Sequence, residues 1–335
     1  MPGFFKMAKP QRAFSERLLH LVCDRFDMNG YLHLRGVLQG EELETARAAA
    51  IRYAHDDPDT LPPPFDDIRR ACDARVHQHT PNTASQLAHA FAFDKSLEHI
   101  VFNDTIWPII HELTDGKPRL NSGSLVNEDH RPGGHGDRPV HLHCGREDGG
   151  PRSARFEVAN GRIYCDNFIV FPYFDDVYPG DGGLLVLPGS HKSNFERPHH
   201  LYGTYGEAER RKWRQDQYPA TGKFGEFTGA KWHDLFQFDG TLDEEAVDMG
   251  LKALTPRAGD VLVMPEALTH GVLPWRPTDR ARHAMLIRFG VSNNGGGGNN
   301  PNSSTVSPES SPSLLSLFLR SAFALQDSAA YIHVM

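Results

Sequence analysis

The stretch FIVFPYFDDVYPGDGGLLVLPGSHK, residues 168–192, decides the fold class of this chain. An apolar run that suits a buried strand leads into a turn, and a second apolar run, LLVL, ends at the next turn, Pro-Gly-Ser. Gly182, Gly183 and Gly189 supply the backbone freedom that a tightly bent β structure needs. Buried strands joined by turns, with no helix between them, favour a sandwich or barrel over a parallel sheet.

Short β-rich runs separated by Gly, Pro and Asn/Asp turns continue on both sides of this stretch. We predict strands near residues 119–126, 139–144, 161–173, 183–188, 251–255, 260–264 and 281–291. Before residue 119 the pattern is mostly helical, and helices are predicted over 12–27, 41–53, 83–93 and 95–114. A short strand is expected after the first helix, and a proline-rich loop at 56–67.

The domain predicted from these patterns spans residues 12–291. The polar and aromatic range 199–250 interrupts the strands as an insertion, and long insertions of this kind are often lids over active sites. An equally good interpretation is that its aromatic residues pack the insertion onto the barrel. Residues 292–313 are rich in Gly, Asn, Ser and Pro and are predicted to be a flexible linker, followed by a helical segment at 314–335.

Charge and cysteine content limit the class of partner. The chain has 335 residues, with 35 basic against 43 acidic groups and a net charge of −8, so no basic field favours a nucleic acid or an anionic membrane. The four cysteines form no CxxC pair, which favours a reduced, cytoplasmic setting over a disulfide framework, with organelle targeting left open. No apolar run approaches the length of a membrane span. The oligomeric state is not indicated.

Histidine is unusually frequent, with 19 copies, and neutral imidazole is the commonest metal ligand in proteins. His141 and His143 are two residues apart in PVHLHCG, so on a strand both would point to one face and Leu142 to the other. Such a pair can equally consist of polar strand residues that are satisfied by hydrogen bonds. His191, after the Pro-Gly-Ser turn, is interpreted as a structural residue or as one that lies behind the ligands, not as a metal ligand.

A second group follows the strand VLVM near residue 262. His270 lies in the loop after Pro265, and Arg280 and Arg282 lead into the next strand. A histidine can bind a metal, while a guanidinium on the next strand can form a bidentate pair with a carboxylate. Alternatively, the arginines form solvated pairs with Asp260 or Asp279.

Three tracts, in this order, resemble the phytanoyl-CoA dioxygenase family of iron(II)- and 2-oxoglutarate-dependent oxygenases. They are FDMNGYLHLRGVLQGEELETAR (26–47), FDDVYPGDGGLLVLPGSHKSNF (174–195) and LTPRAGDVLVMPEALTHGVLPW (254–275). The resemblance implies a mainly β fold with flanking helices, a double-stranded β-helix or jelly roll of the cupin type. It also implies Fe(II) as cofactor and 2-oxoglutarate as co-substrate.

Carried over residue by residue, the resemblance makes His143 and His270 the metal ligands. It makes Arg282 the residue that binds the far carboxylate of 2-oxoglutarate, with Arg280 as the alternative, and places the aromatic Phe171 beside the co-substrate. Further residues expected near the substrate or behind the ligands are His141, Asn121 and Asn127.

The chain departs from the family pattern at the third metal ligand. The usual motif is His-x-Asp, but here Gly145 stands in the third position and has no side chain to bind iron. A nearby carboxylate, Glu147 or Asp148, can take its place. Alternatively, the position stays open for water or chloride, as in the iron/2-oxoglutarate halogenases, which read His-x-Gly or His-x-Ala.

The resemblance therefore predicts a dioxygenase that uses dioxygen and hydroxylates a small or lipid-like organic substrate, with release of succinate and CO2. The alternatives are a halogenase that uses chloride at Gly145 and a jelly-roll protein that binds without catalysis. No acyl-CoA signature is present, so the family name does not identify the substrate.

Overall fold

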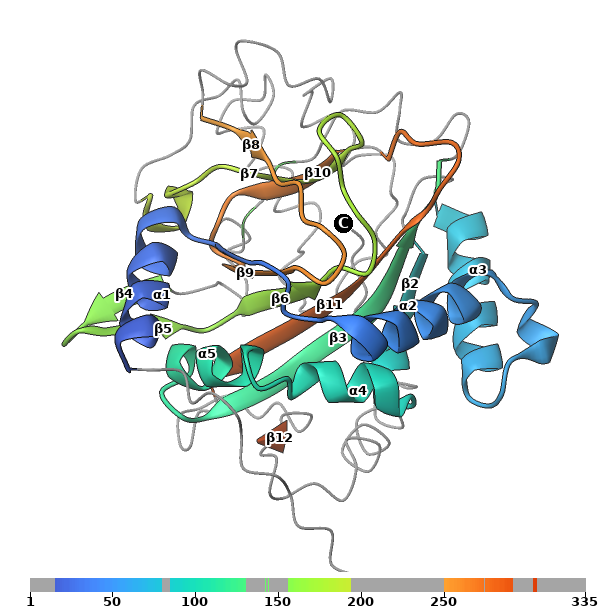
Figure 1. The fold of residues 1–335 in the computed structure, drawn as a ribbon, viewed down its shortest axis with the longest axis horizontal. Coiled ribbons are helices and arrows are strands. Elements are labelled where there is room, and N and C mark those ends of the chain that lie inside the picture. Colours follow the sequence, from blue (N-terminus) through green and yellow to red (C-terminus); the bar gives the residue numbers. More distant parts are fainter. Residues whose placement is uncertain are drawn as a thin grey trace, which may run out of the picture.

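A computed structural model of the chain describes residues 16–79, 85–130, 142, 144, 156–193, 250–273, 275–291 and 304–305 (Figure 1). Its larger sheet has the strand order β1-β9-β6-β11-β3-β12, with β2 also paired to β3. These strands are β1 (Leu32–Leu34), β2 (Ser85–Ala88), β3 (Pro118–Glu128), β6 (Phe168–Pro172), β9 (Val261–Pro265), β11 (Arg282–Val291) and β12 (Ser304–Thr305). All of the pairings are antiparallel.

The smaller sheet has the order β10-β7-β8, and a separate hairpin joins β4 to β5. The bounds are β4 (Phe156–Ala159), β5 (Arg162–Cys165), β7 (Gly183–Val186), β8 (Lys252–Ala253) and β10 (His270–Leu273). Figure 1 shows β7, β8 and β10 on one side of the larger sheet, with helices on its other side. This arrangement confirms the predicted antiparallel jelly roll with flanking helices.

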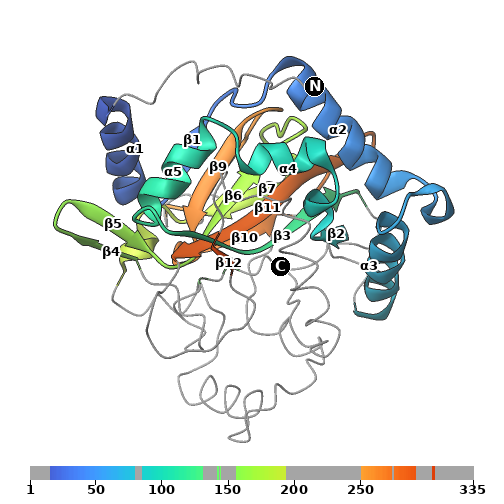
Figure 2. The same cartoon turned by 90° about the horizontal axis from the view of Figure 1, so that it is seen from below.

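The helices are α1 (Glu16–Asn29), α2 (Gly40–His55), α3 (Phe65–His79), α4 (Lys95–Val101) and α5 (Ile106–Leu113). Single turns of 3-10 helix lie at η1 (Pro58–Thr60), η2 (Ala90–Ala92) and η4 (Ser190–Lys192). Seen from below, α2, α4 and α5 cover one face of the larger sheet (Figure 2). Among the described residues, no helix combines the length and the apolar character needed to cross a bilayer. No disulfide links the four cysteines.

Two apolar clusters follow from the alternation of side chains along the strands. On β6, Phe168 and Val170 belong to a helix-side cluster, while Ile169 and Phe171 point the other way. The second set belongs to what we call the inter-sheet cluster, which combines residues of both sheets. It consists of Val126, Ile169, Phe171, Tyr173, Val177, Leu184, Val186, Leu254, Leu262, Met264, Leu268, Trp275, Ala284 and Leu286. Strand β6 is therefore buried on both faces, as its continuous apolar run predicts.

Gly259 lets the backbone of the N-terminal segment pack closely against the larger sheet. Gly259 has φ +86°, and a Cβ placed on it would lie 2.2 Å from the carbonyl oxygen of Leu38. The carbonyl oxygen of Gly259 in turn accepts a hydrogen bond from the Leu38 N–H at 2.9 Å. Only glycine allows the two backbones to approach this closely, just before β9 begins.

Three predictions in the mostly helical part of the chain were wrong in type or extent. The predicted helix 95–114 is divided into α4 and α5 by the turn at residues 102–105. Residues 85–88, inside the predicted helix 83–93, form β2, because the edge of β3 offers them backbone partners from Ser124 to Asn127. The predicted proline-rich loop 56–67 ends earlier, since α3 begins at Phe65. Proline is tolerated in the first turn of a helix, and Pro64 accepts the hydrogen bond of the Ile68 N–H at 3.0 Å.

Two β predictions were also incomplete. The predicted strand 161–173 is divided by a bend at Asp166 and Asn167 into β5 and β6. The expected loop around His270 is the strand β10, which pairs with β7. The range 139–144 lies outside the described residues except for Leu142 and Cys144, and so do nearly all of 199–250, 292–313 and 314–335. Within the predicted linker, Ser304 and Thr305 pair with β3.

Candidate active site

His270 begins β10 and is fully buried. It is paired directly with Val186, a member of the inter-sheet cluster, and directly paired residues of an antiparallel ladder point to the same face. Its imidazole therefore points between the two sheets. His270 Nδ1 lies 2.7 Å from the carbonyl oxygen of Leu268. Because a carbonyl only accepts hydrogen bonds, Nδ1 carries a proton, and in the neutral form of the ring the lone pair is on Nε2. This is the tautomer of a metal-binding histidine.

Arg282 begins β11 and points to the same interior. Ala284 and Leu286, two and four residues further along the strand, belong to the inter-sheet cluster. The residue is only 6% exposed, and its Nη2 forms an ion pair with the carboxylate of Glu128, its direct partner on β3. Nη1 is also buried and makes no hydrogen bond within the part of the chain that the structure describes. Among the described residues, Arg282 thus presents one donor nitrogen, Nη1, to the interior without a partner.

Two aromatic rings and a glycine lie near the guanidinium among the described residues. Its carbon Cζ lies 5.5 Å from the ring centroid of Trp275 and 6.0 Å from that of Tyr173. Gly183 lies against Nη1, since a Cβ there would be 2.6 Å from that atom. Burial raises the pKa of Tyr173 to about 12, so its phenol is neutral near neutral pH. Tyr173 therefore adds no charge beside the positively charged guanidinium of Arg282.

Glu128 balances this charge. Burial raises the pKa of its carboxyl group, while the neighbouring guanidinium of Arg282 acts in the opposite direction. Both side chains are almost completely enclosed, with exposed fractions of 6% for Arg282 and 9% for Glu128. Removing either partner alone would leave a buried charge without compensation.

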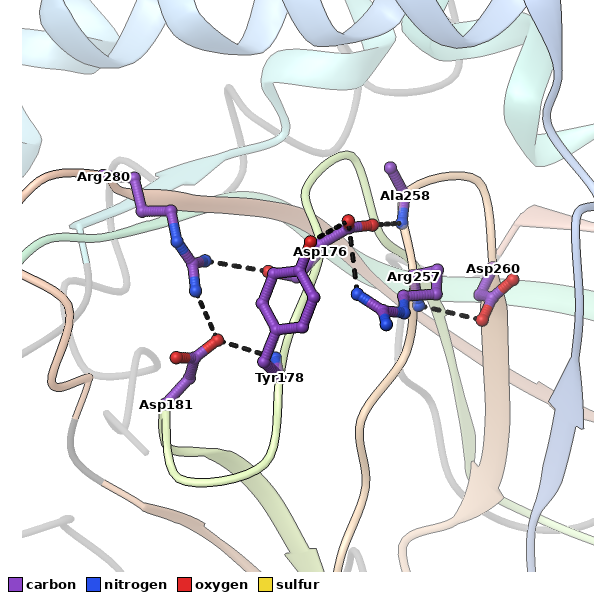
Figure 3. A network of polar contacts seen from close by, with 7 residues as sticks. All are labelled: Asp176, Tyr178, Asp181, Arg257, Ala258, Asp260 and Arg280. Atoms are coloured by element: carbon purple, nitrogen blue, oxygen red, sulfur yellow. Dashed lines mark hydrogen bonds and ion pairs between the residues drawn. The ribbon is translucent and has the colours of Figure 1, made fainter.

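Arg280 differs from Arg282, although it lies only two residues away. Its Nη2 forms an ion pair with Asp181 at 2.5 Å, and its Nη1 donates to the carbonyl oxygen of Asp176 at 3.0 Å (Figure 3). The carboxylate of Asp181 also accepts from the Tyr178 N–H at 2.6 Å. The guanidinium of Arg280 is therefore committed to holding the loop between β6 and β7.

The same network connects this loop to the segment before β9. Asp176 accepts from the backbone N–H of Ala258 at 2.9 Å and from the hydroxyl of Tyr178 at 2.8 Å (Figure 3). The Ala258 hydrogen bond is the main reason that the pKa of Asp176 is lowered. The guanidinium of Arg257 lies 4.1 Å from the Tyr178 ring centroid. These contacts hold the loops on either side of Arg280 together.

The structure brings Phe171 to the same interior as His270 and Arg282, and Phe171 is 8% exposed. Asn127 and Asn121 do not share this position. Asn127 is paired with His283, one residue from Arg282, and therefore points to the opposite face of the sheet. Asn121 lies near the other end of β3, where it donates to the side chain of Asn167 at 2.7 Å.

A family model described as phytanoyl-CoA dioxygenase (PhyH) matches residues 26–284. The chain belongs to this family. Among solved structures, HygX from Streptomyces hygroscopicus with nickel and 2-oxoglutarate bound has a TM-score of 0.52 and is 21% identical, over 84% of this chain and 88% of that chain. HygX with nickel, 2-oxoglutarate and hygromycin B bound has a TM-score of 0.51 and is 20% identical, over 83% and 88%. Likeness at this identity shows a shared fold. No curated protein matches the sequence.

Several predicted site residues of this PhyH-family chain lie outside the described residues: His141, His143, Gly145, Glu147 and Asp148. Their neighbour Leu142 is described and is 2% exposed. It packs in a small apolar cluster with Leu185 and Leu273, which alternate with the interior-facing residues of β7 and β10. Leu142 therefore lies on the outer face of the smaller sheet, and the predicted alternation from His141 to His143 stays a prediction.

Sequence reasoning missed two groups of residues around the site. Four residues lie beside Arg282 because strand pairing and the loops that follow the strands bring them there: Glu128, Tyr173, Trp275 and Gly183. The second group lies on the helix side of β11, where Asp175 accepts from both the N–H and the Nδ1 of His283, at 2.8 and 2.6 Å. No local signal identifies these pairs, because β3, the loop after β6 and β11 are far apart in the chain.

The His283 group anchors the strand that carries Arg282. Arg47 of α2 lies 2.9 Å from Asp175, and the Nε2 atoms of His55 and His283 are 2.9 Å apart. Burial alone would raise the pKa of Asp175, but the hydrogen bonds and charge of His283, together with the charge of Arg47, lower the pKa. These contacts hold α2, the loop after β6 and the start of β11 together.

Proposed function

We propose that this protein is an iron(II)- and 2-oxoglutarate-dependent oxygenase that oxidises a small organic substrate and releases succinate and CO2. The observation that carries the proposal is Arg282, whose buried Nη1 points into the interior with no hydrogen bond among the described residues. A buried guanidinium with an open donor suits the far carboxylate of a dicarboxylate co-substrate. Family membership supports the same proposal.

We infer a metal centre with two imidazole ligands, one of which, His270, lies among the described residues. We assign one position to His270, because its Nδ1–H bond to Leu268 leaves Nε2 able to bind the metal. We assign the other to His143, and the outward burial of Leu142 supports an inward direction for its neighbours. Two neutral imidazoles suit iron(II). The third ligand is either Glu147 or Asp148, or an exogenous group beside Gly145.

Arg282 then orients the co-substrate. Its Nη1 takes the far carboxylate, and Gly183 leaves room for the approach because it has no side chain. Arg280 is not assigned this role, since both of its terminal nitrogens are already engaged. Phe171 is proposed to pack beside the carbon chain of the co-substrate, on the same face as Arg282.

When bound, iron and 2-oxoglutarate would activate dioxygen and supply the oxidising power for the reaction. The chain itself provides position and exclusion of water. The inter-sheet cluster surrounds His270 and Arg282 with apolar side chains, including Leu262, Met264 and Leu268. Such surroundings strengthen the pairing of the co-substrate with Arg282 and limit side reactions with water.

The test is spectroscopic and chemical. Anaerobic addition of iron(II) and 2-oxoglutarate should give a weak visible band near about 500 nm, which is a property of the cofactor complex. Air should then convert 2-oxoglutarate into succinate. The variant His270→Ala should lose the band, while the surface variant His99→Ala should keep it. A wild-type protein that binds iron but gives neither band nor succinate would overturn the proposal.

Halogenation is the second candidate, and Gly145 is the feature that favours it. A glycine cannot bind iron, so chloride can occupy the position of the missing carboxylate. Chloride should then shift the visible band of the wild type, and Gly145→Asp should abolish that shift. If chloride has no effect and Gly145→Asp leaves succinate formation unchanged, the halogenase candidate fails. A protein that binds 2-oxoglutarate without forming succinate would instead be a silent binding protein.

A further inference from the structure

Arg282 is already neutralised before any ligand binds. Its Nη2 is paired with Glu128, and both side chains are enclosed by the larger sheet and the inter-sheet cluster. A guanidinium whose only task was to capture a carboxylate would bind it more strongly without a carboxylate partner of its own. The position of Glu128 therefore needs an explanation beyond the capture of 2-oxoglutarate.

The charged groups around Arg282, among the described residues, balance before a ligand binds. On the interior face, the charged groups at this point are Glu128 on β3 and Arg282 on β11, and Tyr173 nearby is neutral. Asp129 and His283 belong to the opposite side, where Asn127 donates to Asp129 at 3.0 Å and His283 is bound by Asp175. One positive and one negative charge balance before binding, and a second carboxylate would add an uncompensated negative charge.

Like charges that share a buried site cannot both remain ionised at low cost, and one of them gains a proton. Arg282 cannot change its charge, because guanidinium stays protonated in proteins. The incoming carboxylate takes the open Nη1, so Glu128 on Nη2 is the group that can be neutralised. A protonated Glu128 still accepts the Nη2 hydrogen bond through its carbonyl oxygen.

We propose that Glu128 is a positioning residue for Arg282 that takes up one proton from solvent when the far carboxylate of 2-oxoglutarate binds. This inference rests on the proposed function, because it takes 2-oxoglutarate as the ligand of Arg282. Before binding, the ionised Glu128 holds the guanidinium toward Gly183. After binding, the neutral Glu128 keeps this orientation without repelling the ligand. Affinity for the dicarboxylate is thereby coupled to pH.

The experiment counts protons. Calorimetric titration of the anaerobic, iron(II)-loaded protein with 2-oxoglutarate, in buffers of different ionisation enthalpy at one pH, gives the number of protons taken up. We expect an uptake approaching one in the wild type, and a dissociation constant that rises up to about tenfold per pH unit above neutral pH. Glu128→Gln should abolish the uptake and flatten the pH dependence, because the amide accepts from Arg282 but cannot titrate.

A matched control is Asp115→Asn, which changes another arginine-paired carboxylate, exposed and bound to Arg162. Its proton uptake should equal that of the wild type. If Glu128→Gln does not fold, a wild-type count approaching one supports the inference and a count of zero overturns it. Tight binding of 2-oxoglutarate with no proton uptake, or an uptake that survives in Glu128→Gln, overturns the role of Glu128 and leaves the proposed function standing. Absence of any 2-oxoglutarate binding overturns the proposed function itself.

Discussion

The substitution Gly183→Ala tests the position of Arg282 directly. Gly183 has φ +98°, and a Cβ placed there would lie 2.6 Å from Arg282 Nη1 and 3.5 Å from Val177 Cγ1. The first contact is shorter than any that a real Cβ makes, so the guanidinium must move. The positive φ adds a separate backbone cost. The variant therefore carries two penalties that different measurements can resolve.

The two magnitudes follow from the geometry. An alanine at positive φ costs about 1–2 kcal/mol of unfolding free energy. Loss of a hydrogen bond between Nη1 and a carboxylate costs about 1.5–3 kcal/mol, and each ~1.4 kcal/mol is tenfold in affinity. The dissociation constant of 2-oxoglutarate should therefore rise about 10- to 100-fold in Gly183→Ala.

Gly180→Ala is the matched control. Gly180 has φ +90°, but nothing lies within 4 Å of a Cβ placed on it. Urea unfolding should show a similar loss of stability in both variants, and anaerobic titration with 2-oxoglutarate should show weaker binding only in Gly183→Ala. If folded Gly183→Ala binds 2-oxoglutarate within about twofold of the wild type, the reasoning that Nη1 receives the carboxylate beside Gly183 is refuted.

The remaining predictions concern the paired arginines, a buried carboxylate and a titrating histidine. Arg282→Ala should weaken 2-oxoglutarate binding by more than about 100-fold. Arg280→Ala should lower the free energy of unfolding by about 1 kcal/mol and change binding little. An equal loss of 2-oxoglutarate affinity in both variants would contradict the different roles of the two arginines. Asp260 accepts hydrogen bonds from one imidazole and two backbone N–H groups at 2.7–2.9 Å and is 4% exposed. Urea unfolding should therefore show that Asp260→Ala lowers the free energy of unfolding by about 2–4 kcal/mol. The exposed control Asp56→Ala should lower it by less than about 0.5 kcal/mol. Burial is the main reason that the pKa of His55 falls below 6.5, so the unfolded state binds more protons there and stability should decrease as pH drops below 6.5. His55→Gln should reduce this decrease, and an unchanged pH profile would show that His55 does not cause it.

The local signals were sufficient for much of the fold. The apolar run of β6 and the turn before Gly183 predicted buried antiparallel strands, and both are present. Helices α1 and α2 were predicted close to their bounds, because their apolar spacing and helix-forming composition are local properties. The strand β2 was not, because Ser85–Ala88 adopts its conformation only by pairing with β3.

The candidate site was likewise predicted only in part from local signals. The types of residue, namely His143, His270 and an arginine after His270, follow from the sequence and its family resemblance. The resemblance also favours Arg282 over Arg280, but the physical reason for that preference is not local, since both have the same charge and lie two residues apart. Arg280 is occupied by Asp181 from a loop about a hundred residues away in the chain, while Arg282 is turned inward by the register of β11.

The sequence by itself thus determined the class of fold and the chemical groups available, because helix and strand preferences and ligand chemistry are properties of short segments. The tertiary structure alone decided which groups meet. The pairing of Glu128 with Arg282, and the place of Gly183 beside it, depend on strand register and sheet packing. Those contacts join segments that are distant along the chain, so no local pattern encodes them.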